Sequence, residues 1–494
     1  MVYGIILFAK AKKSEKGEIF MNKKELRRQR EIERWERECA KPKKSWYFAW
    51  LVFVICLIYA TDEIASQIGP LMKTEIANDL FASFGESSVG MLDILGVMAI
   101  PFQVVCMFYK PLADKWGRKT FLVINTFGMS LSMLFIFLSD SLWLYFIGAC
   151  MIQFFIPHDM HVVYIMETAP SKHRARIYSS IKFFANMGVM LVPLLRRTLM
   201  HSASEWRIVF LIPAIIGLVC STIALLTARE TDAFIESRLR YLRMTDEERA
   251  VAEAEKKAEN AQGGFGKALK FAFAHNQLRW LYISSAFMNI GFLVTMEYQV
   301  IMTYGYADHF LRTGLFASMT EALNAASVGV VTDALFFFTI GSAVAQVLMG
   351  FICDGKGRKA AAIFMASLCT TSLVIFFTGA NLGWPAWIVG LFCGSCIGSY
   401  YSANDVIIMM IGESSPTNLR SSTISAQAVV MGLGVIFCYL VGIPLVTSLG
   451  NSFAGIISLC MAAPGFVVAL IMLCKKTHDT TGINMDTVTG CEWD

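Results

Sequence analysis

The chain has 494 residues, of which 55% are hydrophobic and only 16% are charged. Soluble domains carry about 25% charged residues, so this composition excludes an ordinary soluble protein. A formal net charge of +5 does not indicate nucleic-acid binding, because the basic residues lie between long apolar runs. A transmembrane helix needs about 20 apolar residues, so a chain of this length accommodates about a dozen spans joined by short loops.

The first predicted elements are a basic tail over residues 1–45 and a six-helix bundle over residues 46–228. Residues 22–44 of the tail are typical of a charged helix at the membrane surface, and Met21 offers an alternative start. The spans of this first bundle are predicted at about 46–70, 88–109, 120–139, 142–166, 177–198 and 207–228.

A polar loop over residues 229–278 precedes a second predicted six-helix bundle over residues 279–474, and residues 475–494 form a terminal tail. We expect the spans of the second bundle at about 279–304, 326–352, 359–379, 384–411, 421–447 and 452–474. The predicted fold class is therefore an all-α membrane protein with twelve transmembrane helices in two halves.

The distribution of Lys and Arg predicts the orientation of these spans. If the N-terminus is cytoplasmic, about 37 of the 43 basic residues fall on the cytoplasmic side. The exceptions are Lys73, Arg196, Arg197, Arg207 and Arg312, which fall outside, and Lys182, which lies within the fifth span as the only expected buried cation. We therefore expect a multi-pass protein of the plasma membrane with the tails and the central loop in the cytoplasm.

The two halves repeat each other in sequence. The segment PLADKWGRK at 111–119 recurs as FICDGKGRK at 351–359, with an offset of 240 residues that Asp93 and Asp333 share. A second pattern, Glu-x-x-Pro-x-x-x-Arg, occurs at 167–174 and again at 413–420. Repeated halves with a binding site between them are a design of secondary transporters.

The repeated loop resembles the G-x-L-x-D-x-x-G-R-K signature of the major facilitator superfamily, and the resemblance extends over nearly the whole chain. The second pattern resembles turns of the sugar-porter and organic-ion (metabolite:proton symporter) branches. The segments at 229–234 and 478–482 resemble degraded tail motifs of sugar porters. The seventh span lacks the Gln-Gln pair of true sugar porters, and the fifth lacks the antiporter motif of drug exporters.

The resemblance implies a cytoplasmic gate in which two acidic–basic clusters latch the outward-open state and separate when the halves rock. The alternative is that these residues only orient the loops. The gate residues are Asp114, Gly117, Arg118, Lys119, Glu167, Arg174, Asp354, Gly357, Arg358, Glu413 and Arg420.

Ionisable residues inside spans are costly and usually mark a pathway. The resemblance implies that spans 1, 4, 7 and 10 line a central cavity, and these spans hold the deep acids. The candidates for binding substrate or protons are Asp62, Glu63, His158, Asp159, His161, Glu297, Tyr400, Tyr401, Asn404 and Asp405. We place Asp159 and Asp405 first, then Asp62 and Glu297, and prefer Asp62 to its neighbour Glu63. We expect Asp93 and Asp333 near the outer surface. Their role is either to cap or pack helices or to take part in function.

These observations predict a secondary active transporter that takes up a small polar organic solute, an organic cation or a sugar-like molecule, by alternating access with a proton. The alternatives are a proton-coupled exporter or antiporter and a non-transporting sensor of the same fold. The sequence contains no P-loop, HExxH or GxSxG motif, so it gives no indication of an enzyme. We expect no metal or cofactor, and the expected partners are the substrate, protons and the bilayer, with the protein a monomer.

Overall fold

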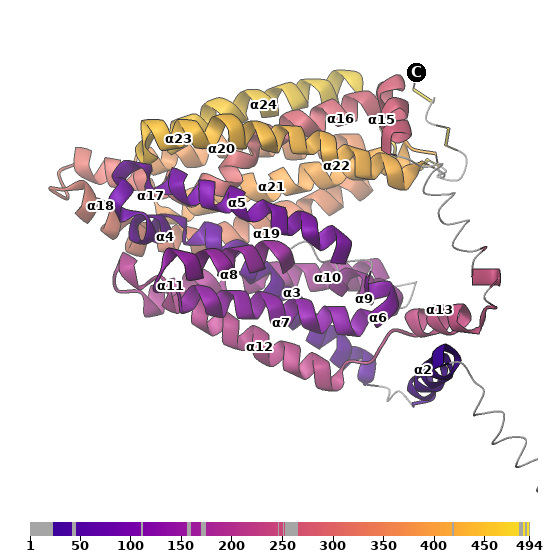
Figure 1. Cartoon of the computed structure of the whole chain (residues 1–494). Helices are drawn as coiled ribbons and strands as arrows, with labels where there is room; N and C mark the ends of the chain where they lie inside the picture. Colours follow the sequence, from indigo (N-terminus) through magenta and orange to yellow (C-terminus); the bar gives the residue numbers. More distant parts are fainter. Residues whose placement is uncertain are drawn as a thin grey trace, which may run out of the picture.

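The computed structural model describes residues 23–41, 46–109, 112–155, 160–168, 174–245, 247–249, 251, 265–416, 419–483, 488–489 and 492–493. Within these residues the secondary structure is helical, without a strand, and the helices form two bundles that lie side by side (Figure 1). This confirms the all-α membrane fold expected from the sequence.

The first bundle is built from the chain before the central loop. Two of its predicted spans are described as pairs of shorter helices. Its helices are α3 (Tyr47–Leu71), α5 (Ser88–Tyr109), α7 (Arg118–Phe137), α8 (Leu142–Phe155) with α9 (Met160–Thr168), α10 (Arg174–Gly188) with α11 (Leu191–Leu199), and α12 (Ile208–Thr227).

The second bundle follows the central loop and repeats the arrangement of the first. Its seventh and eleventh spans are interrupted by short turns of tighter or wider helix. Its helices are α16 (Asn276–Met288) with α17 (Phe292–Arg312), α19 (Thr332–Lys356), α20 (Arg358–Asn381), α21 (Ala386–Glu413), α22 (Arg420–Phe437) with α23 (Ile443–Leu449), and α24 (Ala454–Lys476).

Eight helical stretches among the described residues are long and apolar enough to cross a membrane. They correspond to the predicted spans 1, 2, 3, 6, 8, 9, 11 and 12. Of the other four spans, the fifth is described as two helices, the seventh is broken at Asn289–Gly291, and the tenth (α21) carries Asn404 and Asp405. The fourth includes residues outside the described ones. Polar groups within a membrane usually face a pathway, so we expect these spans to contribute to the lining of a central cavity.

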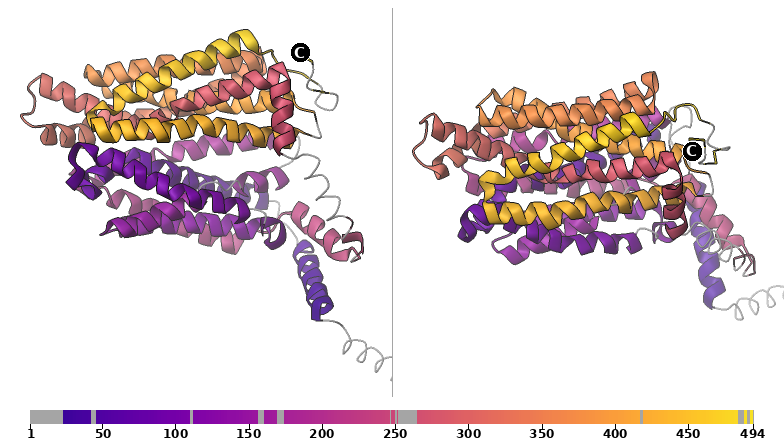
Figure 2. Two further views of the ribbon diagram at one scale, coloured as in Figure 1. Left: turned by 45° about the horizontal axis from the view of Figure 1, so that its top comes forward. Right: turned by 90° about the horizontal axis from the view of Figure 1, so that it is seen from above.

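The bundles have two distinct ends, which we call the loop end and the far end. The loop end carries the turns at 117–119 and 357–359, and α6 (Ala113–Trp116), α13 (Asp232–Arg243) and α15 (Phe265–Ala274) lie there (Figures 1 and 2). α2 (Lys23–Cys39) packs against α13 at this end. The far end carries α4 (Lys73–Leu80) and α18 (Met319–Ala325).

A stripe of glycines allows α21 to pack closely on α19. A Cβ atom at Gly390 would lie 1.9 Å from the carbonyl oxygen of Ala334, and one at Gly394 would lie 1.9 Å from that of Phe338. Cys393 and Cys396 lie beside this stripe and are buried. Small residues let the backbones of membrane helices approach each other, which explains this segment of the sequence.

Candidate functional site

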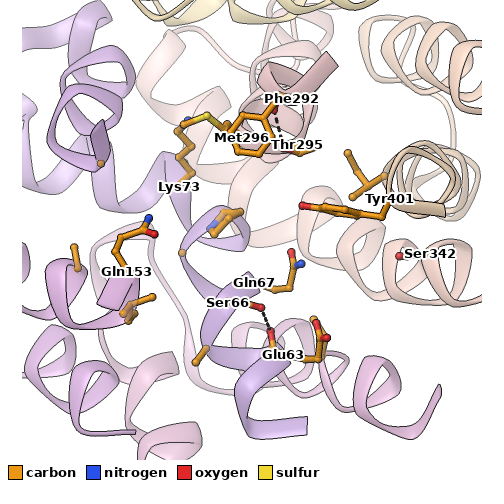
Figure 3. Close-up of a pocket in the computed structure, with 18 of the residues that line it drawn as sticks. Glu63, Ser66, Gln67, Lys73, Gln153, Phe292, Thr295, Met296, Ser342 and Tyr401 are labelled. Atoms are coloured by element: carbon orange, nitrogen blue, oxygen red, sulfur yellow. Dashed lines mark hydrogen bonds between the residues drawn. The ribbon is translucent and has the colours of Figure 1, made fainter. Parts of the chain in front are cut away.

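A cavity of about 670 Å³ lies between the two bundles. It is lined by α3, α5, α8 and α10 from the first half and by α17, α19 and α21 from the second. Figure 3 shows Glu63, Gln67 and Gln153 on one side of this space and Tyr401 pointing into it from the other. Its polar lining includes Glu63, Ser66, Gln67, Gln103, Gln153, Lys182, Asn186, Thr295, Ser342, Gln346 and Asp405.

Two polar contacts cross the cavity from one half to the other. The Lys182 ammonium lies 3.9 Å from the Asp405 carboxylate, and their side chains are 35% and 47% exposed. One turn along α10, the Asn186 amide donates a hydrogen bond of 2.8 Å to the Gln346 side chain. The structure therefore places the predicted residue Asp405 in the cavity, beside the cation of the fifth span.

The structure reverses the preference for Asp62 over Glu63. Asp62 is buried and lies 3.5 Å from His161, whose ring stacks at 4.0 Å on Tyr59. Adjacent helical residues point about 100° apart, so the same turn of α3 directs Glu63 into the cavity and Asp62 toward α9. Among the described residues, no basic side chain lies within ion-pair distance of the Glu63 carboxylate.

Tyr400 and Asn404 lie inside the second bundle instead of lining the cavity. The Tyr400 hydroxyl donates to the side-chain oxygen of Asn289 at 2.5 Å, and the Asn289 amide donates to Asn404 at 2.7 Å. These bonds join α21 to the break between α16 and α17. His158 and Asp159 lie outside the described residues, so the role of Asp159 stays a prediction.

A cluster that we call the Lys73 triad lies at the far end of the cavity. The Lys73 ammonium lies 2.5 Å from Asp93 and 2.7 Å from Glu297, and the three side chains are 7%, 2% and 0% exposed. Lys73 and Asp93 belong to the first half and Glu297 to the second. The expectation that Lys182 is the only buried cation is therefore wrong. Lys73 follows the end of α3 directly and turns inward between the bundles.

A second buried cluster, the Arg196 network, closes the same end. Arg196 is fully buried and pairs with Glu75 at 2.5 Å. Its guanidinium also donates to the carbonyl oxygen of Ser327 at 3.0 Å and to Thr332 at 3.2 Å, which both belong to the second half. Gln299 of α17 accepts from the Thr74 amide at 2.8 Å and donates to Glu75 at 3.2 Å.

Further contacts join the halves at the far end. The Ser87 hydroxyl donates to the carbonyl oxygen of Thr447 at 2.7 Å, and the Val89 amide donates to Asn451 at 3.1 Å. The ionisable groups in these far-end clusters are almost completely buried, whereas Lys182 and Asp405 are partly exposed. The cavity is therefore closed at the far end and more accessible from the loop end.

The loop end of the first half is held by contacts within that half. Arg118 lies 3.2 Å from Glu167, and Glu167 accepts a hydrogen bond from Thr231. The carboxylate of Glu230 accepts from the backbone amides of Arg118 and Lys119 at 2.9 and 3.1 Å. Burial raises the pKa of Glu230, and these backbone hydrogen bonds oppose the rise. A carboxylate at a helix N-terminus is favourable because it meets free N–H groups and the positive end of the helix dipole.

The second half repeats this arrangement. Arg358 lies 3.2 Å from Glu413, and Glu413 accepts a hydrogen bond from Thr480. Asp479 accepts from the Lys359 amide at 2.9 Å, in the place that Glu230 takes in the first half. Sequence reasoning noted the tail segments that contain Glu230 and Asp479 but assigned them no contact.

The remaining predicted gate residues are distributed around these clusters. Asp354 is 89% exposed and reaches Arg358 only at 3.8 Å, and Arg420 donates to the carbonyl oxygen of Gly412 at 2.9 Å. The side chains of Asp114 and Arg174 lie outside the described part of the structure. Each described cluster lies within one half, and its role as a latch stays a prediction.

Both signature glycines adopt conformations that other residues rarely adopt. Gly117 has φ of 106° and Gly357 has φ of 96°. A Cβ atom at Gly117 would lie 2.1 Å from a carboxylate oxygen of Glu230, and one at Gly357 would lie 2.6 Å from Asp479. The glycines are therefore required both for the turn and for the approach of the capping carboxylate.

Two helical bundles around a polar cavity that is closed at one end define a membrane carrier. The chain belongs to the major facilitator superfamily, whose family model matches residues 49–333. It is accordingly a multi-pass membrane transporter and not an enzyme. Among the described residues, no group of three His, Cys, Asp or Glu side chains is placed to hold a metal ion.

Solved structures support the same fold. The chain is similar to a D-xylose–proton symporter, with 17% identity, a TM-score of 0.57 and coverage of 88% of this chain and 99% of the symporter. It is similar to an inward-open xylose transporter XylE from E. coli at 16% identity, a TM-score of 0.56 and coverage of 90% and 98%. A bacterial homologue of the human lysosomal transporter Spinster, inward-facing and unoccupied, matches at 15% identity, a TM-score of 0.52 and coverage of 88% and 100%. No curated protein matches the sequence.

Proposed function

We propose that the protein is a secondary active transporter that takes up a small polar organic solute together with a proton. The solute is an organic cation or a sugar-like molecule, and it binds in the cavity between the halves. Glu63 and Asp405 are the cavity acids that contact it. The observation that carries this proposal is the cavity of about 670 Å³ with Glu63, Lys182 and Asp405 on its walls.

The lining supports a polar solute of this size. Glu63 contributes a carboxylate that forms no ion pair in the described part of the chain, with Lys182 on the lining of the same cavity, and such a carboxylate favours a cation or a proton. The side chains of Gln67, Gln153 and Gln346 offer both donors and acceptors, which suit hydroxyl groups. Tyr401 adds an aromatic face with a polar tip.

The loop end is proposed to face the cytoplasm of a plasma membrane, because most Lys and Arg residues lie in the segments at that end. The far-end contacts then close the outer side, and the structure corresponds to an inward-facing state of an alternating-access cycle. Proton-coupled export uses the same cavity and differs in the direction of net flux, so direction is part of the test. A sensor of the same fold binds its ligand without flux.

The test is uptake into proteoliposomes of a panel of radiolabelled cations, sugars and carboxylates, with and without an inward proton gradient. For the wild type we expect gradient-driven uptake of one class. For Asp405→Asn we expect a loss of roughly tenfold or more, because a charged contact contributes about 1.5–3 kcal/mol.

Asp333→Asn is the matched control, because Asp333 is a half-exposed aspartate remote from the cavity lining. It should transport as the wild type does. Binding without flux would replace the proposal by a sensor, and flux that ignores the gradient would remove proton coupling. Unchanged uptake in Asp405→Asn would remove Asp405 from the site.

A further inference from the structure

The Lys73 triad and the Arg196 network differ in their balance of charge. Arg196 and Glu75 form one cation with one carboxylate, and neutral side chains complete their hydrogen bonds. The triad instead places one ammonium between two carboxylates, Asp93 and Glu297, with all three side chains nearly or fully buried. If every group were ionised, the triad would hold a buried net charge of minus one.

An uncompensated buried charge is costly, and such a site neutralises itself by binding a proton. The geometry indicates where that proton lies, because Asp93 and Glu297 each use one oxygen to contact the Lys73 ammonium, and the second oxygen of each carboxyl group is buried without a hydrogen-bond partner among the described residues. A proton on one of these two oxygens leaves the triad without net charge.

We propose that Asp93 and Glu297 share one proton in the closed far end and that this proton couples gate closure to transport. This inference rests on the proposed function, which requires a coupled proton, and it assigns that proton to the Lys73 triad. Asp93 and Glu297 are then the proton-binding groups, and Lys73 is the positioning group between them.

The division of the triad between the halves explains how the coupling works. When the far end opens, Lys73 and Asp93 move together on α4 and α5 as a neutral ion pair, and Glu297 leaves with α17. Glu297 then faces the outer solution and takes up a proton. Closure brings the neutral carboxyl group back beside Lys73 and Asp93, and the buried triad has no net charge.

Release of the proton occurs from the other side. Lys73 and Asp93 line the cavity, whereas Glu297 does not, so the shared proton leaves through Asp93 into the cavity and toward the loop end. Loss of the proton restores the buried negative charge and favours opening of the far end. One proton is bound from one side and released to the other in each cycle, without a change in any covalent bond of the protein.

The other polar groups around the triad do not supply this charge. Tyr145 from α8 and Tyr439 from the turn Cys438–Gly442 face Asp93, and both are neutral phenols. Arg196 from α11 is matched by Glu75 from α4. The cavity acid Glu63 is not part of either cluster, and its contribution is separated by the variants below.

The repeat supplies a matched control for the proposal. Asp333 occupies the position in the second half that Asp93 occupies in the first, at the offset of 240 residues. It pairs with Arg197 at 3.2 Å, but the two side chains are 48% and 72% exposed. The same residue type at the same repeat position is therefore solvated in one half and buried in the triad in the other.

Hydrogen exchange of α4 in the full-length protein in nanodiscs, measured as a function of pH and corrected for intrinsic rates, tests the proposal. α4 packs on α17 across the halves, so its protection reports closure of the far end. In the wild type, protection should fall by up to about tenfold per pH unit over the window in which the shared proton leaves. Closure binds one more proton than the open state, so closure is favoured at low pH and lost as the pH rises.

In Glu297→Gln the amide imitates the protonated carboxyl group, so protection should stay high and lose its dependence on pH. Asp93→Asn removes the other carboxyl group and should also abolish the slope. Asp333→Asn should behave as the wild type. A flat wild-type profile, or an unchanged slope in Glu297→Gln or Asp93→Asn, would overturn the proposal.

The pH profile of α4 exchange in the wild type can be measured without a folded variant and without a known substrate. Gradient-driven uptake with a flat exchange profile would leave the proposed function intact and remove the triad as the coupling site. A pH-dependent profile that the two carboxyl variants abolish, in a protein without flux, would support the triad and reject the transport proposal.

Discussion

At the far end of the cavity, contacts between charged and polar groups cross from one half to the other, whereas at the loop end the described clusters stay within each half. Lys73 and Arg196 are buried and bond to groups of the second half. Arg118 and Arg358 are partly exposed and pair with acids of their own half. Basic residues therefore join the two halves at the far end and stabilise each half separately at the loop end.

The difference follows from what each end must do when the halves move. A buried ion pair between the halves stabilises one state and must break for the other state to form. An ion pair within a half moves as part of a rigid body and survives the change. The far end is thus the place where a single substitution shifts the balance between states, and the loop end is where it changes local stability.

Arg196→Met should have the largest effect among the variants that break this comparison. Removal of Arg196 leaves Glu75 buried without its cation, and breaking a buried pair costs about 3–5 kcal/mol. We expect a lower melting temperature and loss of α4 protection, measured by thermal unfolding and hydrogen exchange. Adding Glu75→Gln should restore part of the loss, and Arg197→Met, at an exposed neighbour, should change little. Equal effects at 196 and 197 would contradict the distinction between buried and exposed pairs.

Gly117→Ala should have an intermediate effect, confined to the loop end. A residue with a Cβ atom at φ of 106° and ψ of 152° is strained by about 1–3 kcal/mol, and the new atom meets Glu230. Thermal unfolding should show the loss, while α4 exchange at the far end should be unchanged. Gly355→Ala is the control, because a Cβ atom there meets nothing within 4 Å and the helix interior favours alanine. A change in α4 protection in Gly117→Ala would show that the two ends are coupled.

Thr231→Val and Thr480→Val should have the smallest effects, and Thr231→Val should have the larger effect of the two. Each removes one hydrogen bond, to Glu167 or to Glu413, with a contribution of about 0.5–1.5 kcal/mol. The Thr231 hydroxyl also accepts from the Phe234 amide at 3.3 Å as the N-cap of α13, and loss of a cap costs about 0.5–2 kcal/mol. Thermal unfolding of the two variants sharpens the comparison, and a larger loss in Thr480→Val would contradict this account of the two clusters.

Much of the fold could be predicted because its signals are local or periodic. The length of the apolar runs limits where helices cross the membrane, and the offset of 240 residues between 111–119 and 351–359 reveals the two halves. The glycines of the signature loop could be assigned to tight turns for the same reason. Among the predicted site residues, Glu63, Tyr401 and Asp405 line the cavity, and their role in binding stays a prediction.

The sequence by itself determined the membrane class, the helical architecture, the repeat and the set of ionisable residues within the spans. The tertiary structure decided which of them meet. In the sequence, Lys73 lies in a predicted loop and Arg196 lies at the outer end of a predicted span. Their burial depends on Glu297 and Ser327, more than 120 positions away in the chain. The choice between Asp62 and Glu63 depends on the rotation of α3, which packing against α9 and the cavity sets. Contacts between distant segments follow from how the two bundles pack, and no local pattern of residues records that packing.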